Sequence, residues 1–347
     1  MNRRISPRPL DLERGRIDLS HGAGGRAMAQ LIEELFEAHF DNPLLARHND
    51  QACFEVGAGR MVITTDGFVI SPLFFPGGDI GSLAVHGTIN DVAMAGARPL
   101  YLACGMILEE GFPLADLRAI VASMAGAAKS AGVPIVTGDT KVVERGKGDG
   151  VFITTTGVGV VPAGVDIASD RAQPGDAVLI NGSIGDHGTA VLSKRENLSF
   201  ETEILSDSAA LHGLVAAMLA AAPGIHAMRD PTRGGLAALL NEIARESRVG
   251  IMIDEGAIPI AVAVRGACEL LGLDPLYVAN EGKLVAFCAA AEAVRLLEAM
   301  RAHPLGRRAS IIGKVVDDAD GYVQMRTSFG GTRIVDWLAG EQLPRIC

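Results

Sequence analysis

The chain has 347 residues, of which 48% are hydrophobic, so it is long enough for about two domains with substantial cores. A formal net charge of −10 and an aromatic content of 4% argue against the basic groove and stacking side chains of a nucleic-acid binder. The longest apolar run, at 214–223, is too short to span a bilayer. Arg3 and Arg4 are followed by prolines instead of an apolar leader, so we expect a cytoplasmic protein without a membrane partner.

The first half of the chain mixes strand and helix patterns. Residues 1–20 are polar and rich in Pro and Arg, and we interpret them as a lead-in. Apolar residues at helical spacing then predict a helix over 27–40. The other expected elements are a strand at 60–70 interrupted by a turn at Asp66-Gly67, helices at 80–95 and 113–131, and strands at 100–108, 133–136 and 151–161.

A polar run at 168–176, which contains the turn signal Pro174-Gly175, separates two predicted domains. We place these domains at 21–166 and 167–338, followed by a tail at 339–347. In the second domain we expect strands at 176–181, 251–254, 283–289, 310–316 and 322–326, and helices at 207–222, 235–247 and 291–303. Because strands and helices alternate irregularly, the order favours two α+β domains over one regularly wound parallel sheet.

The five cysteines are widely scattered, with no CxxC pair and no His/Cys cluster. This spacing argues against a structural zinc or iron–sulfur site and indicates free thiols. The cysteines are Cys53, Cys104, Cys268, Cys288 and Cys347.

Four segments place an acidic residue beside Gly, Asn or Thr at the edge of an expected strand or helix. Hard divalent cations need oxygen ligands, and magnesium is usually shared between a few carboxylates and nucleotide phosphates. Asp-Gly pairs are also common turn signals, so each segment alone is weak. Asn90-Asp91 is harder to dismiss, because both residues are poor helix formers in an apolar helix. The acidic residues are Asp66, Asp91, Asp139 and Asp230, with Asp50 as a further candidate.

Two glycine-rich turns precede expected helices. His21-Gly22-Ala23-Gly24-Gly25-Arg26 offers backbone N–H groups and a helix N-terminus to an anion, although it lacks the Gly-Lys-Ser/Thr of a P-loop. The alternative is an ordinary flexible lead-in. Thr232-Arg233-Gly234-Gly235 is a second candidate anion site.

Three further side chains are candidates for catalysis. Glu281, between an apolar stretch and Gly282, is a carboxylate that burial would tune as a base, or else a turn residue at a solvated edge. Lys141 is a candidate cation or an ordinary surface lysine. His187, in Gly185-Asp186-His187-Gly188, is a candidate catalytic residue or a satisfied loop histidine.

The chain ends in Pro344-Arg345-Ile346-Cys347, and a thiol at a free end does not easily serve as a core residue. The proline keeps the segment extended, so a tail from 339 onward reaches roughly 25–30 Å. Such a tail can carry a sulfur into an active site, or it can be a frayed end with a chance cysteine. The nearby terminal carboxylate opposes thiolate formation in the free tail more than Arg345 favours it, so we expect an unactivated thiol there.

Taken together, these motifs resemble the HypE family of hydrogenase maturation factors, from about residue 17 to the C-terminus. The matching stretches are His-Gly-Ala-Gly-Gly at 21–25, Pro-Leu-Phe-Phe-Pro-Gly-Gly at 72–78, Asn-Asp-Val-Ala at 90–93, Thr-Gly-Asp-Thr-Lys-Val-Val at 137–143, Gly-Asp-His-Gly at 185–188, Thr-Arg-Gly-Gly at 232–235, Asn-Glu-Gly-Lys at 280–283 and the terminal Pro-Arg-Ile-Cys. The resemblance implies two α+β domains of the aminoimidazole-ribotide-synthetase type. It also implies a homodimer whose N-terminal domains share a barrel-like β core, a cleft for ATP and a mobile C-terminal tail.

The resemblance also implies roles for the candidate residues. Asp66, Asp91, Asp139 and Asp230 are expected to be magnesium–ATP ligands, with Asp50 less certain. His21, Gly22, Gly24 and Gly25 are expected to cover phosphate, and Asn90, Thr140, Thr232, Arg233, Gly234 and Gly235 to complete the cofactor site. Catalysis is expected to involve Cys347, Glu281, Lys141 and His187.

The implied reaction is an ATP-dependent dehydration. A HypF-type carbamoyltransferase places a carbamoyl group on Cys347, and the protein dehydrates it to a thiocyanate. The nitrile then passes to iron on a HypC–HypD complex and becomes a cyanide ligand of a [NiFe] hydrogenase.

Two other kinds of protein remain as alternatives. One is another ATP-using enzyme of the same superfamily, such as a selenophosphate synthetase or a thiamine-phosphate kinase. A selenophosphate synthetase carries its reactive residue near the N-terminus, and residues 1–30 contain no cysteine. The other is a non-catalytic scaffold whose tail only docks on partners.

Overall fold

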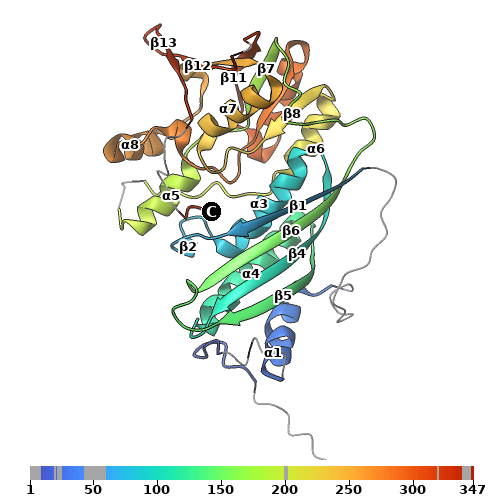
Figure 1. The fold of residues 1–347 in the computed structure, drawn as a ribbon, viewed down its shortest axis with the longest axis vertical. Helices are drawn as coiled ribbons and strands as arrows, with labels where there is room; N and C mark the ends of the chain where they lie inside the picture. Colours follow the sequence, from blue (N-terminus) through green and yellow to red (C-terminus); the bar gives the residue numbers. More distant parts are fainter. Residues whose placement is uncertain are drawn as a thin grey trace, which may run out of the picture.

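The computed structural model describes residues 9–18, 21, 26–42, 60–198, 202–318, 320–337 and 345–347. Four candidate residues therefore lie outside the described residues: Gly22, Gly24, Gly25 and Asp50. The chain folds around two separate β-sheets, each with its own helices, and its last residues lie between them (Figure 1). None of the helices in the described ranges is long and apolar enough to cross a bilayer.

The N-terminal sheet has four strands in the order β1-β6-β4-β5. Its strands are β1 (Arg60–Phe68), β4 (Arg98–Glu109), β5 (Ile135–Val143) and β6 (Val151–Val161). Only β4 and β5 are parallel, and α4 (Leu114–Ala131) makes the crossover between them. α3 (Ile80–Met94) and α4 pack together against one face of this sheet (Figure 1).

Smaller elements flank this sheet. The predicted helix at 27–40 is present as α1 (Arg26–Leu31), a π-helical turn η2 (Ile32–Glu37) and α2 (Ala38–Phe40), which pack near α4. A two-stranded ribbon of β2 (Phe74–Phe75) and β3 (Gly78–Asp79) leads into α3. The Asp79 carboxylate accepts hydrogen bonds from the backbone N–H groups of Gly81 and Ser82 and so caps α3.

α3 is buried almost all round, because it lies between the N-terminal sheet and the C-terminal domain. Small residues let the neighbouring chains approach it closely: a Cβ at Gly87 would meet the ring of Phe68 at 3.0 Å. The polar pair Asn90-Asp91 lies in the last turns of this buried helix, so both side chains point into protein or into a cleft.

The C-terminal sheet has seven strands in the order β13-β12-β9-β11-β7-β10-β8. They are β7 (Asp176–Ile180), β8 (Ile225–Arg229), β9 (Gly250–Asp254), β10 (Val285–Ala289), β11 (Ser310–Val316), β12 (Val323–Arg326) and β13 (Thr332–Ile334). The helices are α5 (Asp186–Arg195), α6 (His212–Ala221), α7 (Gly235–Ser247), α8 (Val262–Leu271) and α9 (Ala293–Ala302), with short 3₁₀ turns η4 (Glu255–Ala257), η5 (Pro275–Tyr277), η6 (Ala290–Glu292) and η7 (Pro304–Gly306).

Both faces of this sheet are covered. Val178 and Ile180 of β7 pack with residues of α7, whereas Ala177 and Leu179 pack with residues of α6 and α9. This explains why every residue of β7 is buried and why its sequence is nearly continuous in apolar residues.

The structure corrects several boundaries. Asp66-Gly67 does not interrupt β1, because both residues pair with β6, opposite Thr155 and Thr154. The strand expected at 133–136 is β5, which runs on to Val143. The helix expected from 207 begins at His212, which leaves 207–211 without regular secondary structure. Elements that we did not predict are α5, α8, β2, β3, β8 and β13.

Candidate active site

The C-terminal residues are docked into the protein by their backbone. The N–H of Ser71 donates to the carbonyl oxygen of Arg345, and the N–H of Val69 donates to Cys347 O, both at 3.2 Å. Residues 345–347 thus lie antiparallel to the chain that follows β1. Main-chain hydrogen bonds hold these three residues between the two domains (Figure 1), and the mobility of the tail stays a prediction.

Side chains of α5 hold the same tail. Arg195 donates from Nη2 to the Arg345 carbonyl at 2.7 Å and from Nε to the Ser71 carbonyl at 2.8 Å. His187 Nε2 donates to the Ile346 carbonyl at 2.8 Å. Each of the last three carbonyl groups therefore has a hydrogen-bond donor from the body of the protein.

The Ile346 side chain anchors the tail in the hydrophobic core. It is only 3% exposed and belongs to the same cluster as Phe68 and Phe75 of the N-terminal domain. Cys347 packs against that cluster, next to Ile346. Burial of one isoleucine side chain contributes about 1.5–3 kcal/mol to the docking of the tail.

Glu281 faces the terminal thiol. Glu281 is 3% exposed, and its Oε1 atom has no hydrogen-bond partner among the residues that the structure describes. Burial raises the pKa of the Cys347 thiol, and the adjacent Glu281 charge raises it further, whereas Arg233 opposes the shift. This pocket therefore disfavours the thiolate form of Cys347.

The backbone of Glu281 is held from α3. Asn90 Nδ2 donates to the carbonyl oxygens of Glu281 (3.2 Å) and Ala209 (3.0 Å), and Asn90 Oδ1 accepts from Leu211 N–H (2.8 Å). The Asn90 amide is thus fully used within the chain. It positions Glu281, and no donor of this amide is left for the nucleotide that we had expected it to bind.

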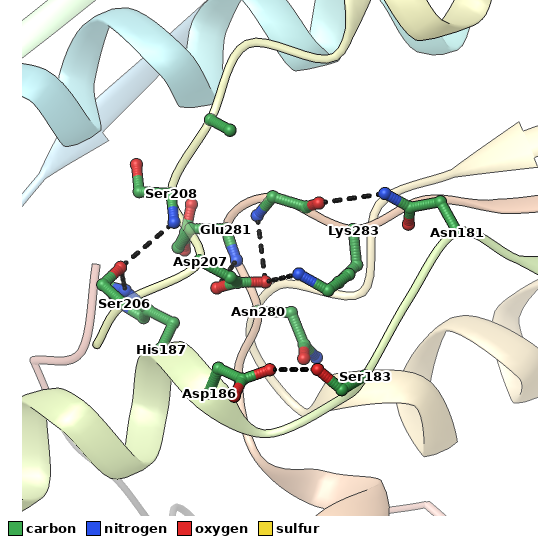
Figure 2. Close-up of polar contacts among 12 residues, drawn as sticks. Asn181, Ser183, Asp186, His187, Ser206, Asp207, Ser208, Asn280, Glu281 and Lys283 are labelled. Carbon is green, nitrogen blue, oxygen red and sulfur yellow. Dashed lines mark hydrogen bonds and ion pairs between the residues drawn. The ribbon is translucent and has the colours of Figure 1, made fainter. Parts of the chain in front are cut away.

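Asn280, next to Glu281, joins the same loop to α5. Its Oδ1 accepts from the N–H of Gly185, and its Nδ2 donates to the carbonyls of Pro231 and Val278. These contacts bring His187 at the start of α5 and Glu281 to the same end of the C-terminal sheet (Figure 2).

Asp66, Asp91 and Asp230 gather beside Glu281. Burial raises the pKa of Asp230 to about 7, and the charge of Asp91 contributes to this shift. Burial also raises the pKa of Asp91, against the hydrogen bond from Thr64 Oγ1. Burial and these neighbouring carboxylates raise the pKa of Glu281 well above its usual range. The repulsion among these four carboxylates indicates that the site has too little positive charge to balance them.

An open cleft of about 350 Å³ adjoins these carboxylates. It lies between the two domains, where Thr64 and Asp91 face Arg229 and Asp230. Its volume falls within the range of small-molecule sites. Arg233 and the N-terminus of α7 begin just beyond Asp230, so positive and negative groups both border this region.

Comparisons with known proteins agree with this geometry. Residues 48–161 and 173–326 match the N-terminal and C-terminal domains of the AIR synthase related protein family. The carbamoyl dehydratase HypE of Cupriavidus necator is 71% identical over 98% of this chain and 97% of its own length. The carbamoyl dehydratase HypE of Escherichia coli is 48% identical over 95% of this chain. The chain belongs to the HypE family.

Solved HypE structures share the whole fold. A crystal structure of the hydrogenase maturation protein HypE in complex with ATP matches 95% of this chain at 50% identity with a TM-score of 0.92. A HypE–HypF complex matches 89% at 50% identity with a TM-score of 0.79. A thiamine-monophosphate kinase from Stenotrophomonas maltophilia, at 23% identity and a TM-score of 0.63, shares the fold alone.

Asp139 and Lys141 of this HypE-family chain lie away from Glu281. Asp139 of β5 pairs with Gly105 of β4, and Gly105 pairs with Thr154 of β6. Thr154 in turn pairs with Gly67 of β1. Asp139 is therefore three strand spacings, or about 14 Å, from β1. Because side chains alternate along a strand, Asp139 and Lys141 point to the face opposite Asp66. The expected grouping of Asp139 and Lys141 with the other site residues is therefore wrong within one protomer.

Lys141 is exposed and pairs with its own neighbour. Its Nζ lies 2.7 Å from both carboxylate oxygens of Asp139, and both side chains are 62% exposed. The hydrogen bond from Lys141, with a smaller opposing effect of desolvation, lowers the pKa of Asp139. Thr140 points the other way and lines a small apolar cavity of about 110 Å³ beside Phe36.

The remaining predicted cofactor residues have local roles in the described structure. His21 is buried, and its Nδ1 accepts from the backbone N–H of Asp18 at 3.1 Å. Gly234 and Gly235 both have positive φ, and a Cβ on Gly235 would meet the Leu276 carbonyl oxygen at 2.6 Å. The glycine pair is thus required by the turn into α7, and its contact with a nucleotide stays a prediction, as do those of Thr232 and Arg233.

The carboxylate group fits magnesium held jointly with a nucleotide. Among the described residues, no three His, Cys, Asp or Glu side chains are close enough to form a ready metal site. Magnesium needs only one or two protein carboxylates when phosphates and waters complete its shell. A bound cation would lower the raised pKa values of Asp91 and Asp230, so these two carboxylates suit the ion.

Three residues at the site escaped the sequence analysis: Arg195, Ser206 and Asp207. Ser206-Asp207-Ser208 did offer a signal, since a polar triplet before an apolar helix is typical of an N-cap. That signal points to a helix start, whereas these three residues form no helix and contact the Glu281 loop. Arg195 offered no local signal, because its partners are backbone carbonyls far away in the chain.

Proposed function

We propose that this protein uses ATP to dehydrate an S-carbamoyl group on its own Cys347 to a thiocyanate. The carbamoyl oxygen attacks the γ-phosphorus of ATP, and ADP leaves. The C–O bond then breaks, the oxygen departs in inorganic phosphate, and the two amide protons are lost to a base and to water. The products are the S-cyanated cysteine, ADP and phosphate, so the net chemistry removes one water from the carbamoyl group.

The observation that carries this proposal is the meeting of the Cys347 thiol with Glu281. A thiol that served only as an attachment point needs no buried carboxyl beside it. Oε1 of that carboxyl has no partner, which leaves an acceptor for the protons of a group attached to the sulfur. A neutral carbamoyl group also suits a pocket that disfavours a thiolate.

Glu281 acts as the base in this proposal. Burial and the nearby aspartates raise its pKa, and a carboxylate with a raised pKa is a stronger base toward a weakly acidic amide. Asn90 holds its backbone, so the carboxyl group keeps one orientation. The buried Ile346 side chain restricts the position of the Cys347 sulfur in the same way.

ATP is the co-substrate, and the cleft beside Asp91 and Asp230 is its proposed site. Asp66, Asp91 and Asp230 would hold magnesium, whose charge would neutralise the transferring phosphoryl group. Arg233 and the backbone N–H groups at the start of α7 would donate hydrogen bonds to the phosphate oxygens of ATP.

We further propose a homodimer, formed through the uncovered face of the N-terminal sheet. The large apolar side chains on this face are exposed: Met61 by 54%, Ile63 by 73% and Ile107 by 44%. Such a patch on a sheet favours a second sheet packed against it. Asp139 and Lys141 lie on this same face, so a second copy is what could bring them to a shared site.

The proposed partners follow from the chemistry. A HypF-type carbamoyltransferase supplies the carbamoyl group, and a HypC–HypD complex accepts the nitrile for the iron centre of a [NiFe] hydrogenase. The tail must leave its pocket for both exchanges. The proposed location is the cytoplasm, where ATP is available.

The decisive experiment is intact-mass spectrometry of the full-length chain with HypF, carbamoyl phosphate, ATP and magnesium. We expect a carbamoyl adduct on Cys347 that becomes lighter by one water when the chain is active. The Cys347→Ala variant should show neither adduct. A carbamoyl adduct that persists with ATP present would favour the scaffold role and contradict the proposal.

A further inference from the structure

We propose that Ser206 and Asp207 are positioning residues that align the Cys347 tail with Glu281. Asp207 fixes the loop that carries Glu281, and Ser206 fixes the imidazole that holds the tail. Neither residue touches the reacting group. The catalytic part of this inference rests on the function proposed above, whereas the positioning itself can be measured without any turnover.

Asp207 contacts the Glu281 loop through both carboxylate oxygens. Oδ1 accepts from the backbone N–H of Glu281 at 3.1 Å, and Oδ2 accepts from that of Gly282 at 3.3 Å (Figure 2). The carbonyl oxygen of Glu281 is held on the other side by Asn90. The peptide groups on both sides of the proposed base are therefore fixed.

The Asp207 backbone also lies directly against this loop. A Cβ at Gly282 would come within 1.8 Å of the Asp207 carbonyl oxygen, so only glycine fits there. Ala209 N–H donates to the Glu281 carbonyl at 3.5 Å. The segment 207–211, which the sequence led us to expect as part of a helix, thus packs along the loop without regular secondary structure.

A buried ion pair keeps Asp207 charged. Lys283 Nζ lies 2.7 Å from Oδ2, and the two side chains are 11% and 6% exposed. Burial opposes the charge on Asp207, but the charge and hydrogen bond of Lys283 and the Glu281 amide together lower its pKa. A charged acceptor makes stronger hydrogen bonds to backbone N–H groups than a neutral one.

Ser206 acts on the tail through His187. The Ile346 carbonyl can only accept, so His187 Nε2 carries a proton, and burial lowers the pKa of this imidazole and keeps it neutral. Nδ1 then accepts from the Ser206 hydroxyl at 2.8 Å. Without that hydroxyl the other tautomer would compete, and its Nε2 lone pair would face the Ile346 carbonyl oxygen.

The same segment is anchored to the N-terminal domain. Ser206 N–H donates to the Pro76 carbonyl at 2.8 Å, and the Ser208 hydroxyl pairs with His86 Nδ1 of α3 at 3.0 Å. Phe75 packs edge-on against the His187 ring at 5.4 Å between centroids. Because Ser206 and Asp207 are adjacent, the tail and the Glu281 loop share one support.

Two measurements test the positioning without turnover. Hydrogen exchange of the 280–283 amides should accelerate about three- to tenfold in Asp207→Asn, the change expected from one lost buried hydrogen bond. Alkylation of Cys347 by iodoacetamide, followed by peptide mapping, should accelerate by a similar factor in Ser206→Ala and His187→Ala. Ser206→Thr and His187→Gln keep the required groups and should restore protection.

A third measurement tests the consequence for catalysis. In a single turnover of the carbamoylated chain, Asp207→Asn should slow the loss of water about tenfold or more while the Kd for ATP changes less than about twofold. The double variant Asp207→Asn/Lys283→Met removes the unpaired charge of Lys283. It does not restore the hydrogen bond that Asp207 accepts from the loop amide. If this double variant recovers wild-type turnover, Asp207 only stabilises the fold and the proposal is wrong.

Unchanged exchange in Asp207→Asn, or unchanged alkylation in Ser206→Ala, would also overturn the proposal. If both change as expected while the wild-type chain never loses water, the positioning stands and the proposed function fails. Thermal unfolding of each variant shows whether the chain still folds.

Discussion

The Cys347 thiol meets the Glu281 carboxyl group in a buried pocket between the two domains. The thiol comes from a tail that is held by main-chain hydrogen bonds, and the carboxyl group comes from a loop that is held by Asn90 and Asp207. These contacts fix the position of the Cys347 thiol relative to the Glu281 carboxyl group. This relation is the basis of the predictions that follow.

Glu281→Gln should abolish dehydration without preventing carbamoylation. The amide cannot take up a proton, so we expect the loss of water to slow by about 100-fold or more. Carbamoylation of the tail occurs on the partner and should proceed at the wild-type rate. Mass spectrometry should find the carbamoyl adduct accumulating, and rapid conversion to the lighter adduct would contradict the role of Glu281.

Asn90→Ala should destabilise the protein by about 2–3 kcal/mol, because buried partners at Ala209, Leu211 and Glu281 lose their hydrogen bonds. Urea unfolding measures this change. Asp91→Asn is a matched control at the next position, and it should not destabilise, since it relieves the repulsion among the carboxylates. Equal losses in both variants would mean that Asn90 has no special role.

His86 should make stability fall in acid. Burial lowers its folded pKa to about 4, below the ordinary 6.5, so the folded state disfavours the proton. This contribution is complete above pH 6.5 and is lost as the pH falls toward 4, up to about 3 kcal/mol. Urea unfolding between pH 7 and 4.5 should show a weaker pH dependence for His86→Asn than for the wild type. The same slope in both would exclude His86.

Ile63→Asp should give a monomer if the exposed sheet face is the dimer interface. A charge on a 73% exposed isoleucine leaves the monomer fold intact but is costly in an apolar interface. Leu270→Asp on α8 is the matched control, because Leu270 is also 73% exposed but lies away from this sheet. Light scattering after size exclusion should separate the two, and two dimeric variants would place the interface elsewhere.

Ile346→Asp should release the tail, because it places a charge in the core beside Phe68 and Phe75. We expect Cys347 to react with iodoacetamide at least about tenfold faster, while the global unfolding free energy falls by no more than about 1.5–3 kcal/mol, the contribution of the lost burial. Arg345→Ala is the control. Its ion pair with Asp149 is exposed, so its loss should change reactivity less than about twofold.

The sequence predicted the type of most elements, because apolar periodicity is a local property of the chain. The helices at 80–95, 113–131 and 235–247 and the strand at 151–161 appear with nearly the same bounds. It failed where tertiary contacts override local signals. Asp66-Gly67 signals a turn but is paired across β1 and β6. Residues 207–211 have the composition of a helix start but form no helix and pack along the Glu281 loop.

The sequence by itself determined which side chains are present for chemistry: a terminal thiol, a carboxylate beside glycine and several aspartates. Only the tertiary structure decided which of them meet. Strand alternation sends Asp139 and Lys141 to one face of the N-terminal sheet and Asp66 to the other, a distinction that register makes and motifs do not. Backbone contacts through Val69, Ser71 and α5 decided that Cys347 points to Glu281, because peptide N–H and C=O groups carry no residue identity for a motif to reveal.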